Sequence, residues 1–266
     1  MSGPLLRLAR REDVPGILTV WNAAFGDSEE LIRRLLLELG LLEHMAVAEQ
    51  DGRVAAVMSA FDGLRFGRTS ASYLYALGTL PDYRGQGLGR AVLLKAADLA
   101  FGRGAELVCL HPASPSLTAW YQSLGFRPGG AEPSRSVPAA RDGEISFCSL
   151  TAEDYAARRR EAAVSVPLSL LRVQALFCSL FGGGLLLAET PEGRFPLCAE
   201  FLEDTLLLRE LLCPPALRQR IAGAAAAHFG AGNAVLSALP GAQPLLFLGR
   251  GPDIRPPREP LPFPLD

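Results

Sequence analysis

Six residues, three of them glycine, lie between an apolar run and a segment of helical periodicity. They are Arg84-Gly85-Gln86-Gly87-Leu88-Gly89, with the apolar run Tyr73 to Leu80 before them and the helical pattern of Arg90 to Ala100 after them. Glycine has no Cβ, so successive backbone N–H groups can converge on an anion. The N-terminus of the following helix carries partial positive charge. The segment is therefore suited to bind a pyrophosphate.

Length and composition limit the kinds of protein that can carry this loop. The chain has 266 residues, of which 49% are hydrophobic and 20% charged, and its net charge is -2. This length favours a second hydrophobic core, so we expect two modest domains. The composition argues against disorder and against a broad surface for polyanions. Nucleic acid is therefore not expected as a partner.

The sequence also argues against a membrane span, a signal peptide and a metal site. No apolar run approaches the roughly 20 residues of a membrane span, and charged residues from Arg7 to Asp13 interrupt any signal-peptide core. We therefore expect a cytoplasmic protein with no membrane partner. The three histidines, His44, His111 and His228, lack ligand spacing. The cysteines form an odd, scattered set that suits buried reduced thiols: Cys109, Cys148, Cys178, Cys198 and Cys213.

Helix and strand patterns alternate through the N-terminal half. Asp13 and Ser28 are expected to cap two helices, the second reaching Leu39, and Asp51-Gly52 is a strong hairpin signal. Arg127 to Gly143 predicts a loop or weak hairpin that leaves the first domain. The other expected elements are the strands Met45 to Glu49, Val54 to Phe61, Tyr73 to Leu80 and Glu106 to Leu110, and a helix from Ser116 to Leu124 that Gly125 ends.

Short matches between the two halves indicate an internal duplication. Glu12-Asp13 recurs 141 residues later as Glu153-Asp154, and Gly52-Arg53 recurs at the same interval as Gly193-Arg194. Two further matches keep the same order along the chain: Ala48-Glu49 recurs as Ala188-Glu189, and Ala96-Ala97 with Phe101-Gly102 and Gly104 recurs 128 residues later as Ala224-Ala225 with Phe229-Gly230 and Gly232. Four ordered matches favour duplication over chance.

The second copy loses the glycines of the loop. At the interval of 128 residues, Cys213, Pro215 and Leu217 stand opposite the three loop glycines. Proline has no N–H to donate, so this copy is not expected to hold a pyrophosphate. The alternative is that Pro214-Pro215 simply begins a helix, which is also common. Either interpretation predicts a single binding site for the whole chain.

With these residues in view, the N-terminal half resembles the GNAT acetyltransferase superfamily. The acetyl-CoA loop of that superfamily has the form [Gln/Arg]-x-x-Gly-x-[Gly/Ala], which Arg84, Gly87 and Gly89 satisfy, and Ala119 to Phe126 is similar to its tyrosine-bearing helix that ends in Gly-Phe. The resemblance covers Leu5 to Phe126.

The resemblance implies an α/β fold with a mixed, mostly antiparallel central sheet flanked by helices, duplicated in tandem. It implies a catalytic domain at 1–140 and a degenerate second GNAT-like domain at 141–249. A proline-rich tail, expected to be extended, follows at 250–266.

The resemblance also implies which residues bind acetyl-CoA and which residue donates a proton. Tyr121 matches the tyrosine that protonates the departing thiolate. Ser114 stands where many members have an asparagine for the pantetheine arm. The residues that match cofactor-binding positions are Leu77, Gly78, Thr79, Arg84, Gly85, Gln86, Gly87, Leu88, Gly89, Arg90 and Ser114.

The activity implied is acetyl transfer from acetyl-CoA to a small-molecule or peptide amine, by direct attack in a ternary complex and without a metal. A homodimer is compatible with these features. The strand Tyr73 to Leu80 lacks the glutamate that many members use as a base, so the general base is unassigned, with His111 the histidine nearest the expected cleft. The alternative is a catalytically silent acyl-CoA-binding sensor or structural module, and a longer acyl donor also stays open. Asp62 and Glu49 are weak candidates for attracting a cationic acceptor.

Overall fold

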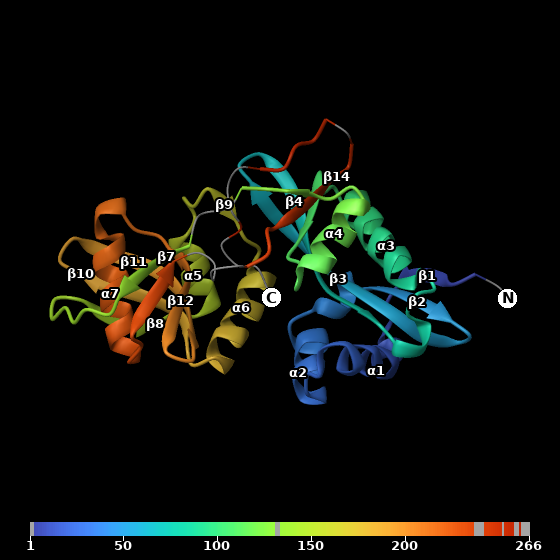
Figure 1. Ribbon diagram of the computed structural model, residues 1–266, viewed down its shortest axis with the longest axis horizontal. Coiled ribbons are helices and arrows are strands. Elements are labelled where there is room, and N and C mark those ends of the chain that lie inside the picture. Colours follow the sequence, from blue (N-terminus) through green and yellow to red (C-terminus); the bar gives the residue numbers. More distant parts are fainter. Residues whose placement is uncertain (1–2, 131–133, 237–241, 252, 258–260, 262–266) are drawn as a thin grey trace. The chain divides into compact units, whose positions relative to one another are not determined.

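The computed structural model describes residues 3–130, 134–236, 242–251, 253–257 and 261, and the chain forms two compact units (Figure 1). Unit 1 comprises Met1–His111, Gln122–Arg127 and Leu246–Pro256, and unit 2 comprises Pro112–Tyr121, Pro128–Leu245 and Pro257–Asp266. Each unit is described by itself. Among the described helices, none combines the length and the apolar character that crossing a membrane requires.

A mixed sheet forms the centre of unit 1. Its strand order is β1-β2-β3-β4-β5-β14-β6, and neighbours from β1 to β4 are antiparallel, β4 and β5 are parallel, and β5 and β14 are antiparallel. The strands are β1 (Leu5–Leu8), β2 (Ala46–Gln50), β3 (Arg53–Phe66), β4 (Thr69–Thr79), β5 (Leu107–Leu110), β14 (Leu246–Gly249) and β6 (Arg127–Pro128).

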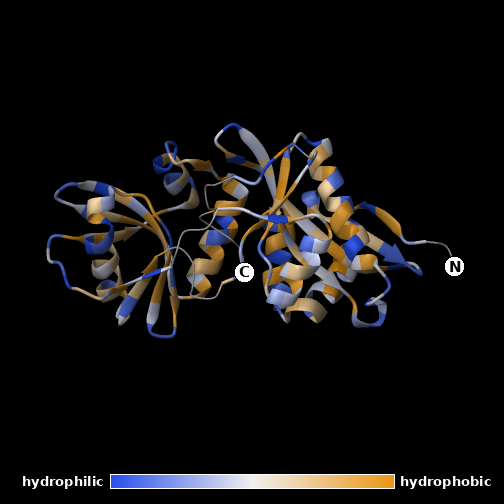
Figure 2. Cartoon of the chain, turned by 45° about the horizontal axis from the view of Figure 1, so that its top comes forward, coloured by the Kyte–Doolittle hydropathy of each residue, from blue (hydrophilic) through white to orange (hydrophobic). Residues whose placement is uncertain are grey.

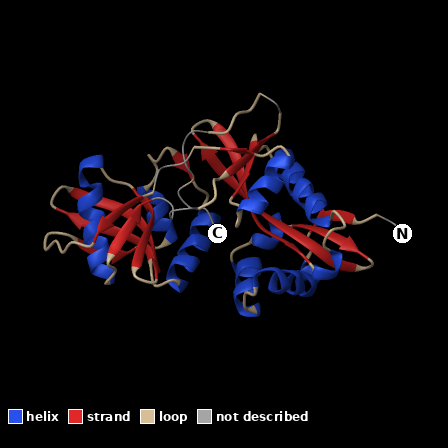
Figure 3. Cartoon of the chain, viewed as in Figure 1, coloured by secondary structure: helices blue, strands red, loops and turns tan. Residues whose placement is uncertain are grey.

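Two long helices of unit 1 pack on this sheet, each through one apolar face (Figure 3). In α3 (Leu88–Gly102) the buried side chains recur at helical spacing: Leu88, Val92, Leu93, Ala96, Ala97 and Ala100. In α1 (Val14–Phe25) Ile17 and Trp21 are fully buried. The shorter helices are η1 (Arg11–Asp13), α2 (Glu29–Arg33), the π-helix η2 (Arg34–Glu38), η3 (Leu41–His44) and η4 (Pro81–Tyr83).

Local signals in unit 1 gave mostly correct predictions. Asp51 and Gly52 both have positive φ, 52° and 72°, in the tight turn between β2 and β3, as a hairpin of this type requires. The hydroxyl of Ser28 accepts from the N–H of Leu31 and caps α2 as expected. The expected cap of α1 was wrong: the Asp13 carboxylate instead accepts from the N–H of Arg10 at 2.7 Å and pairs with Arg7 at 2.6 Å. A 3₁₀ turn precedes α1 and takes this carboxylate.

Unit 2 repeats the strand order and the strand directions of unit 1. Its sheet is β8-β10-β11-β12-β13-β7, with β12 and β13 parallel and all other neighbours antiparallel. Its strands are β7 (Arg135–Pro138), β8 (Ser146–Ser149), β9 (Val164–Ser165), β10 (Gly184–Thr190), β11 (Gly193–Leu202), β12 (Thr205–Leu211) and β13 (Asn233–Leu236), and its helices are α5 (Ala152–Arg158), α6 (Leu168–Leu180), η5 (Pro215–Leu217) and α7 (Arg218–Phe229). Both sheets are mixed and mostly antiparallel, so the expected fold class is confirmed.

The division of the chain differs from the one at 140 and 249 that the sequence suggests. Strand β14 pairs with β5, from Leu246 opposite Leu110 to Gly249 opposite Leu107, and so belongs to the sheet of unit 1. Within the expected loop at 127–143, β7 joins the sheet of unit 2 beside β13. The boundary also passes through α4 (Pro115–Ser123), between Tyr121 and Gln122. Of the expected tail, Pro252, 258–260 and 262–266 lie outside the described residues.

The core of unit 2 is apolar on the face that α7 covers and carries buried ion pairs elsewhere. Figure 2 shows hydrophobic residues along the strands and hydrophilic ones in most turns. The carboxylate of Glu210 accepts from the Tyr155 hydroxyl at 2.8 Å and from the Arg159 guanidinium at 2.8 and 3.2 Å. Glu200 accepts from Gln174 at 2.6 Å and from Arg209 at 2.9 Å. A buried charge is tolerable only when it is paired in this way.

We expect Glu210→Ala to lower the free energy of unfolding by about 3–5 kcal/mol, because it leaves the Arg159 guanidinium buried without its carboxylate. Chemical denaturation followed by circular dichroism measures the change. The control is Glu153→Ala, which removes an exposed ion pair with Arg172 and should leave the unfolding midpoint unchanged. Equal midpoints for both variants would contradict a stabilising role for the buried pair.

Candidate functional site

Strand β4 loses its β5 neighbour halfway along its length. The parallel ladder joins Ala71, Ser72 and Tyr73 of β4 to β5, whereas the pairing of β4 with β3 continues to Thr79. In the described sheet, the side of β4 toward β5 therefore carries no ladder beyond Tyr73. Backbone N–H and C=O groups without a ladder partner are available to an extended ligand that lies along the strand.

A bulge distorts β4 in this open part. Ala76 has a φ of 57°, and the register with β3 shifts between Val57 and Ser59. A residue other than glycine in this conformation costs about 1–3 kcal/mol, and such strain is concentrated at functional sites. Tyr75, just before the bulge, is half-buried, and its ring lies 6.0 Å from that of Trp21. The bulge redirects the backbone at the three strand positions expected to contact a ligand, Leu77 to Thr79.

The glycine loop follows directly after β4 and η4. Its residues 84–87 are exposed, and Gly85 and Gly87 have φ of 76° and 83°. Helix α3 begins at Leu88, and Ala91 donates to the carbonyl of Gly87 at 3.0 Å. The N–H groups of the first turn before Ala91 have no helical acceptor, as at every helix start. No acidic side chain lies in this turn. The loop thus offers several N–H donors and a positive helix end at one exposed place.

Side chains of the loop bond back to the segment before it. Arg84 donates through Nε to the carbonyl of Thr79 at 3.2 Å, and Gln86 donates to the carbonyl of Asp82 at 2.9 Å. A Cβ on Gly89 would lie 3.2 Å from the Thr79 hydroxyl oxygen. These contacts join the loop to the end of β4 and leave the backbone of Gly85 and Gly87 unobstructed, since nothing lies within 4 Å of a Cβ built on either.

Gly78 permits a close approach between β4 and helix α1. A Cβ there would lie 3.2 Å from Ala24 Cβ and 3.2 Å from Val20 Cγ1, tighter than ordinary packing allows. The sequence suggested such an approach at this glycine, and the contact with α1 is its physical reason. The residues from Leu77 to Arg90 that were expected to bind a cofactor therefore form one continuous strand, loop and helix of unit 1.

Ser114 and Tyr121 belong to unit 2 by their contacts. Ser114 Oγ lies 2.9 Å from Ser116 Oγ and accepts from the N–H of Leu117 at 3.3 Å, so it caps the start of α4. Tyr121 is 6% exposed, and burial raises the pKa of its hydroxyl to about 12. A phenol in this state stays protonated at every physiological pH. Tyr121 therefore meets the electrostatic requirement for a proton donor, while its role stays a prediction.

The carboxylates considered for attracting a cationic acceptor are already paired. Asp62 lies on β3, not in a loop, and contacts His44, Arg103 and the Ser72 hydroxyl at 3.0, 2.6 and 2.6 Å. Burial raises the pKa of Asp62, but these three partners together outweigh it and hold that pKa well below its usual range. Glu49 pairs with Arg7 at 2.8 Å. Among the described residues, no group of three or more metal-ligating side chains comes together.

The corresponding part of unit 2 differs from the glycine loop. There the 3₁₀ turn η5 runs directly into α7, with Pro214 and Pro215 at its start. Glu210 stands opposite Cys198 as Gly78 stands opposite Val57, and Cys198 lies 141 residues after Val57. Where unit 1 has a glycine, unit 2 thus holds a carboxylate engaged by Tyr155 and Arg159. Unit 2 offers neither the N–H donors nor the open strand position of unit 1.

Comparisons with known proteins agree with this geometry. The model of the acetyltransferase (GNAT) family matches residues 15–126, which include the open strand, the glycine loop and α4. The chain contains a GNAT acetyltransferase domain. The match ends at Phe126, directly after the Gly125 that ends α4, where its N–H bonds to the carbonyl of Gln122.

Solved structures share the fold over most of the chain. A GCN5-related N-acetyltransferase from Kribbella flavida is 18% identical, with a TM-score of 0.70 over 92% of this chain and 70% of that one. One from Anabaena variabilis ATCC 29413 is 14% identical, with a TM-score of 0.68 over 92% and 72%. A probable N-acyltransferase from Enterococcus faecalis V583 is 16% identical, with a TM-score of 0.69 over the same shares. At these identities the likeness concerns the fold.

Two features of the GNAT domain were not foreseen from the sequence. The positive φ of Ala76 has no sequence signal, because alanine is not a turn residue and the bulge depends on the pairing with β3. Strand β14 had a signal, the apolar run Leu245 to Leu248 after Pro244, but its partner strand lies in the other half of the chain. Both features depend on contacts that are remote in sequence.

We expect the Tyr121 phenol to stay protonated to about pH 11, because burial raises its pKa to about 12, while a tyrosine in water ionises near pH 10. The tyrosinate absorbance of the wild type minus that of Tyr121→Phe, followed against pH, measures this directly. A midpoint near pH 10 in the difference would show that Tyr121 is exposed to water. Circular dichroism at each pH serves as the control for unfolding.

Proposed function

We propose that the GNAT domain transfers an acetyl group from acetyl-CoA to an amine, which attacks the thioester directly in a ternary complex. The observation that carries the proposal is the exposed loop at the start of α3, with left-handed glycines at 85 and 87, directly after a strand edge that lacks a β5 partner. A diphosphate and an extended amide chain are the two parts of coenzyme A that such a surface can bind.

The residues present fit the coenzyme. A diphosphate would accept from the N–H groups of Gly85 to Arg90, and the guanidinium groups of Arg84 and Arg90 add positive charge beside them. The pantetheine arm would lie along the open side of β4 at Leu77, Gly78 and Thr79. Ser114 offers a hydroxyl in place of the asparagine amide that many members use, so its reach is shorter.

The chain's own groups would act on the reacting atoms in two ways. A backbone N–H near the bulge of β4 would donate to the thioester oxygen and stabilise the charge that develops there. Tyr121 would donate a proton to the sulfur as the C–S bond breaks and the C–N bond forms. The amine must also lose a proton. The acceptor class we propose is a small-molecule or peptide amine.

A second candidate function rests on a specific observation, the lack of any Asp or Glu in β4 from Thr69 to Thr79. A domain without a base at this strand could bind acyl-CoA without catalysis. Mixing the protein with acetyl-CoA and a panel of amines, and measuring free thiol, separates the two functions. Thiol release that depends on an amine supports the transferase, and binding without release from any amine supports a silent acyl-CoA sensor.

Unit 2 is, in this proposal, a degenerate copy of the same domain that binds no coenzyme. The support is the identical order and direction of its six strands together with the prolines and ion pairs at the position of the site. It follows that the full chain binds one coenzyme A. Isothermal titration with coenzyme A reports this stoichiometry directly.

We expect Gly87→Val to weaken coenzyme A binding by about tenfold or more, because a left-handed φ costs a β-branched residue about 1–2 kcal/mol and the loop would leave its binding shape. Isothermal titration measures the loss. The matched control is Gly104→Val, beyond the other end of α3, where φ is 102° and nothing lies within 4 Å of the added Cβ. The proposal fails if both variants bind as the wild type does.

We expect Tyr121→Phe to lower kcat by about 100-fold or more while leaving the Kd for coenzyme A within a factor of about two, because general acid catalysis contributes roughly 10²–10⁴-fold. Stopped assays of thiol release give kcat, and titration with coenzyme A gives Kd. A kcat equal to that of the wild type would remove Tyr121 from the mechanism without affecting the assigned coenzyme site.

A further inference from the structure

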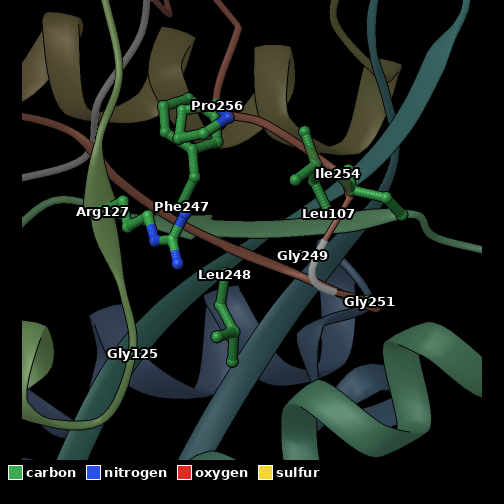
Figure 4. Close-up of a pocket in the computed structure, with 9 residues that line it drawn as sticks. All are labelled: Leu107, Gly125, Arg127, Phe247, Leu248, Gly249, Gly251, Ile254 and Pro256. Atoms are coloured by element: carbon green, nitrogen blue, oxygen red, sulfur yellow. The ribbon is translucent and has the colours of Figure 1, made fainter.

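A cavity of about 250 Å³ lies in unit 1 between β5, β14, β6 and the returning C-terminal segment (Figure 4). It lies toward the opposite end of the sheet from the glycine loop. Leu107, which lines it, pairs with Ala71 of β4, whereas the loop follows Thr79. Eight residues of strand separate these positions, which corresponds to about 26 Å. The cavity is therefore distinct from the proposed coenzyme site.

The walls of the cavity are apolar, and one side chain brings charge to it. Leu107 and Phe247 are each 1% exposed, and Ile254 and Pro256 cover them from the C-terminal segment. Arg127 is the charged member of the lining. Figure 4 shows its side chain extending from β6 toward the middle of the labelled group, between Phe247 and Leu248. Within the described parts of the chain, no carboxylate pairs with this guanidinium.

Glycines keep the cavity open where side chains would fill it. A Cβ on Gly249 would lie 2.9 Å from the carbonyl oxygen of Ile254 and 3.0 Å from that of Gly251, so only glycine lets the segment turn back here. Ile254 donates to the carbonyl of Gly251 at 3.3 Å and holds this turn. Gly125, on the opposite wall, has a φ of 97°. The returning segment therefore forms a wall of the cavity without occupying it.

We propose that this cavity binds a small monocarboxylate with a compact apolar body, whose carboxylate pairs with Arg127. A guanidinium binds a carboxylate through two parallel hydrogen bonds, and the pair is strengthened beside an apolar wall that excludes water. The volume is below the roughly 300–1,000 Å³ typical of pockets for drug-sized ligands, so the ligand has the size of a single substituted ring or a branched short chain. Its binding needs no coenzyme.

Benzoate is a suitable probe, and isothermal titration without coenzyme A tests the proposal. We expect saturable binding to the wild type, and Arg127→Gln should weaken it by about tenfold, because it removes a charge-assisted pair. Benzamide has nearly the same shape without the charge, and should bind weakly and equally to both proteins.

The matched control is Arg11→Gln, an exposed arginine of the N-terminal 3₁₀ turn in the same unit, which should bind benzoate as the wild type does. Thermal unfolding followed by circular dichroism establishes that both variants fold. Lack of saturable benzoate binding by the wild type, or equal affinities of the wild type and Arg127→Gln, overturns the proposal. Neither result affects coenzyme A binding, so this inference and the proposed function can fail separately.

Discussion

The end of the β4–β5 ladder at Tyr73 determines where unit 1 can bind a ligand. A parallel pair of strands satisfies one side of each backbone, and losing it leaves polar groups that must find other partners. The open side of β4 continues to Thr79, and the free N–H groups at the start of α3 follow after a short loop. Unpartnered donors are therefore concentrated along one strand, loop and helix start. The strained φ of Ala76 lies within the same stretch.

Comparison of the two units shows that this concentration is separable from the fold. Unit 2 has the same six-strand order and directions, yet its helix start carries two prolines and its strand position opposite Cys198 carries Glu210. The Glu210 pair with Arg159 and Tyr155 gives every charged group there a partner inside the protein. Such a pair adds little net stability compared with apolar packing, but it closes the position to an outside ligand. The fold can thus persist after the binding surface is lost.

Features that depend on neighbouring residues could be predicted from the sequence, and features that depend on distant pairing could not. The glycine loop, the Asp51-Gly52 turn and the Ser28 cap follow from the conformations that these residues themselves favour. The start of α1 was misjudged because Arg7, on another strand, competes for Asp13. The bulge at Ala76 and the pairing of Asp62 with His44 and Arg103 depend on side chains and strands remote in sequence. Sequence patterns carry no direct record of such contacts.

The sixth strand of each sheet explains why the domain boundaries were the hardest feature to predict. Unit 2 takes β7 from the segment before its first strand β8, and unit 1 takes β14 from a segment that follows all of unit 2. Leu110 pairs with Leu246, so the free edge of β5 stays without this partner until the intervening chain has been synthesised. Closing so long a loop costs only slightly more entropy than closing a short one, because the cost grows with the logarithm of length. The delay is therefore set by synthesis order, and both the last strand of unit 1 and the cavity beside Arg127 form after unit 2 is complete.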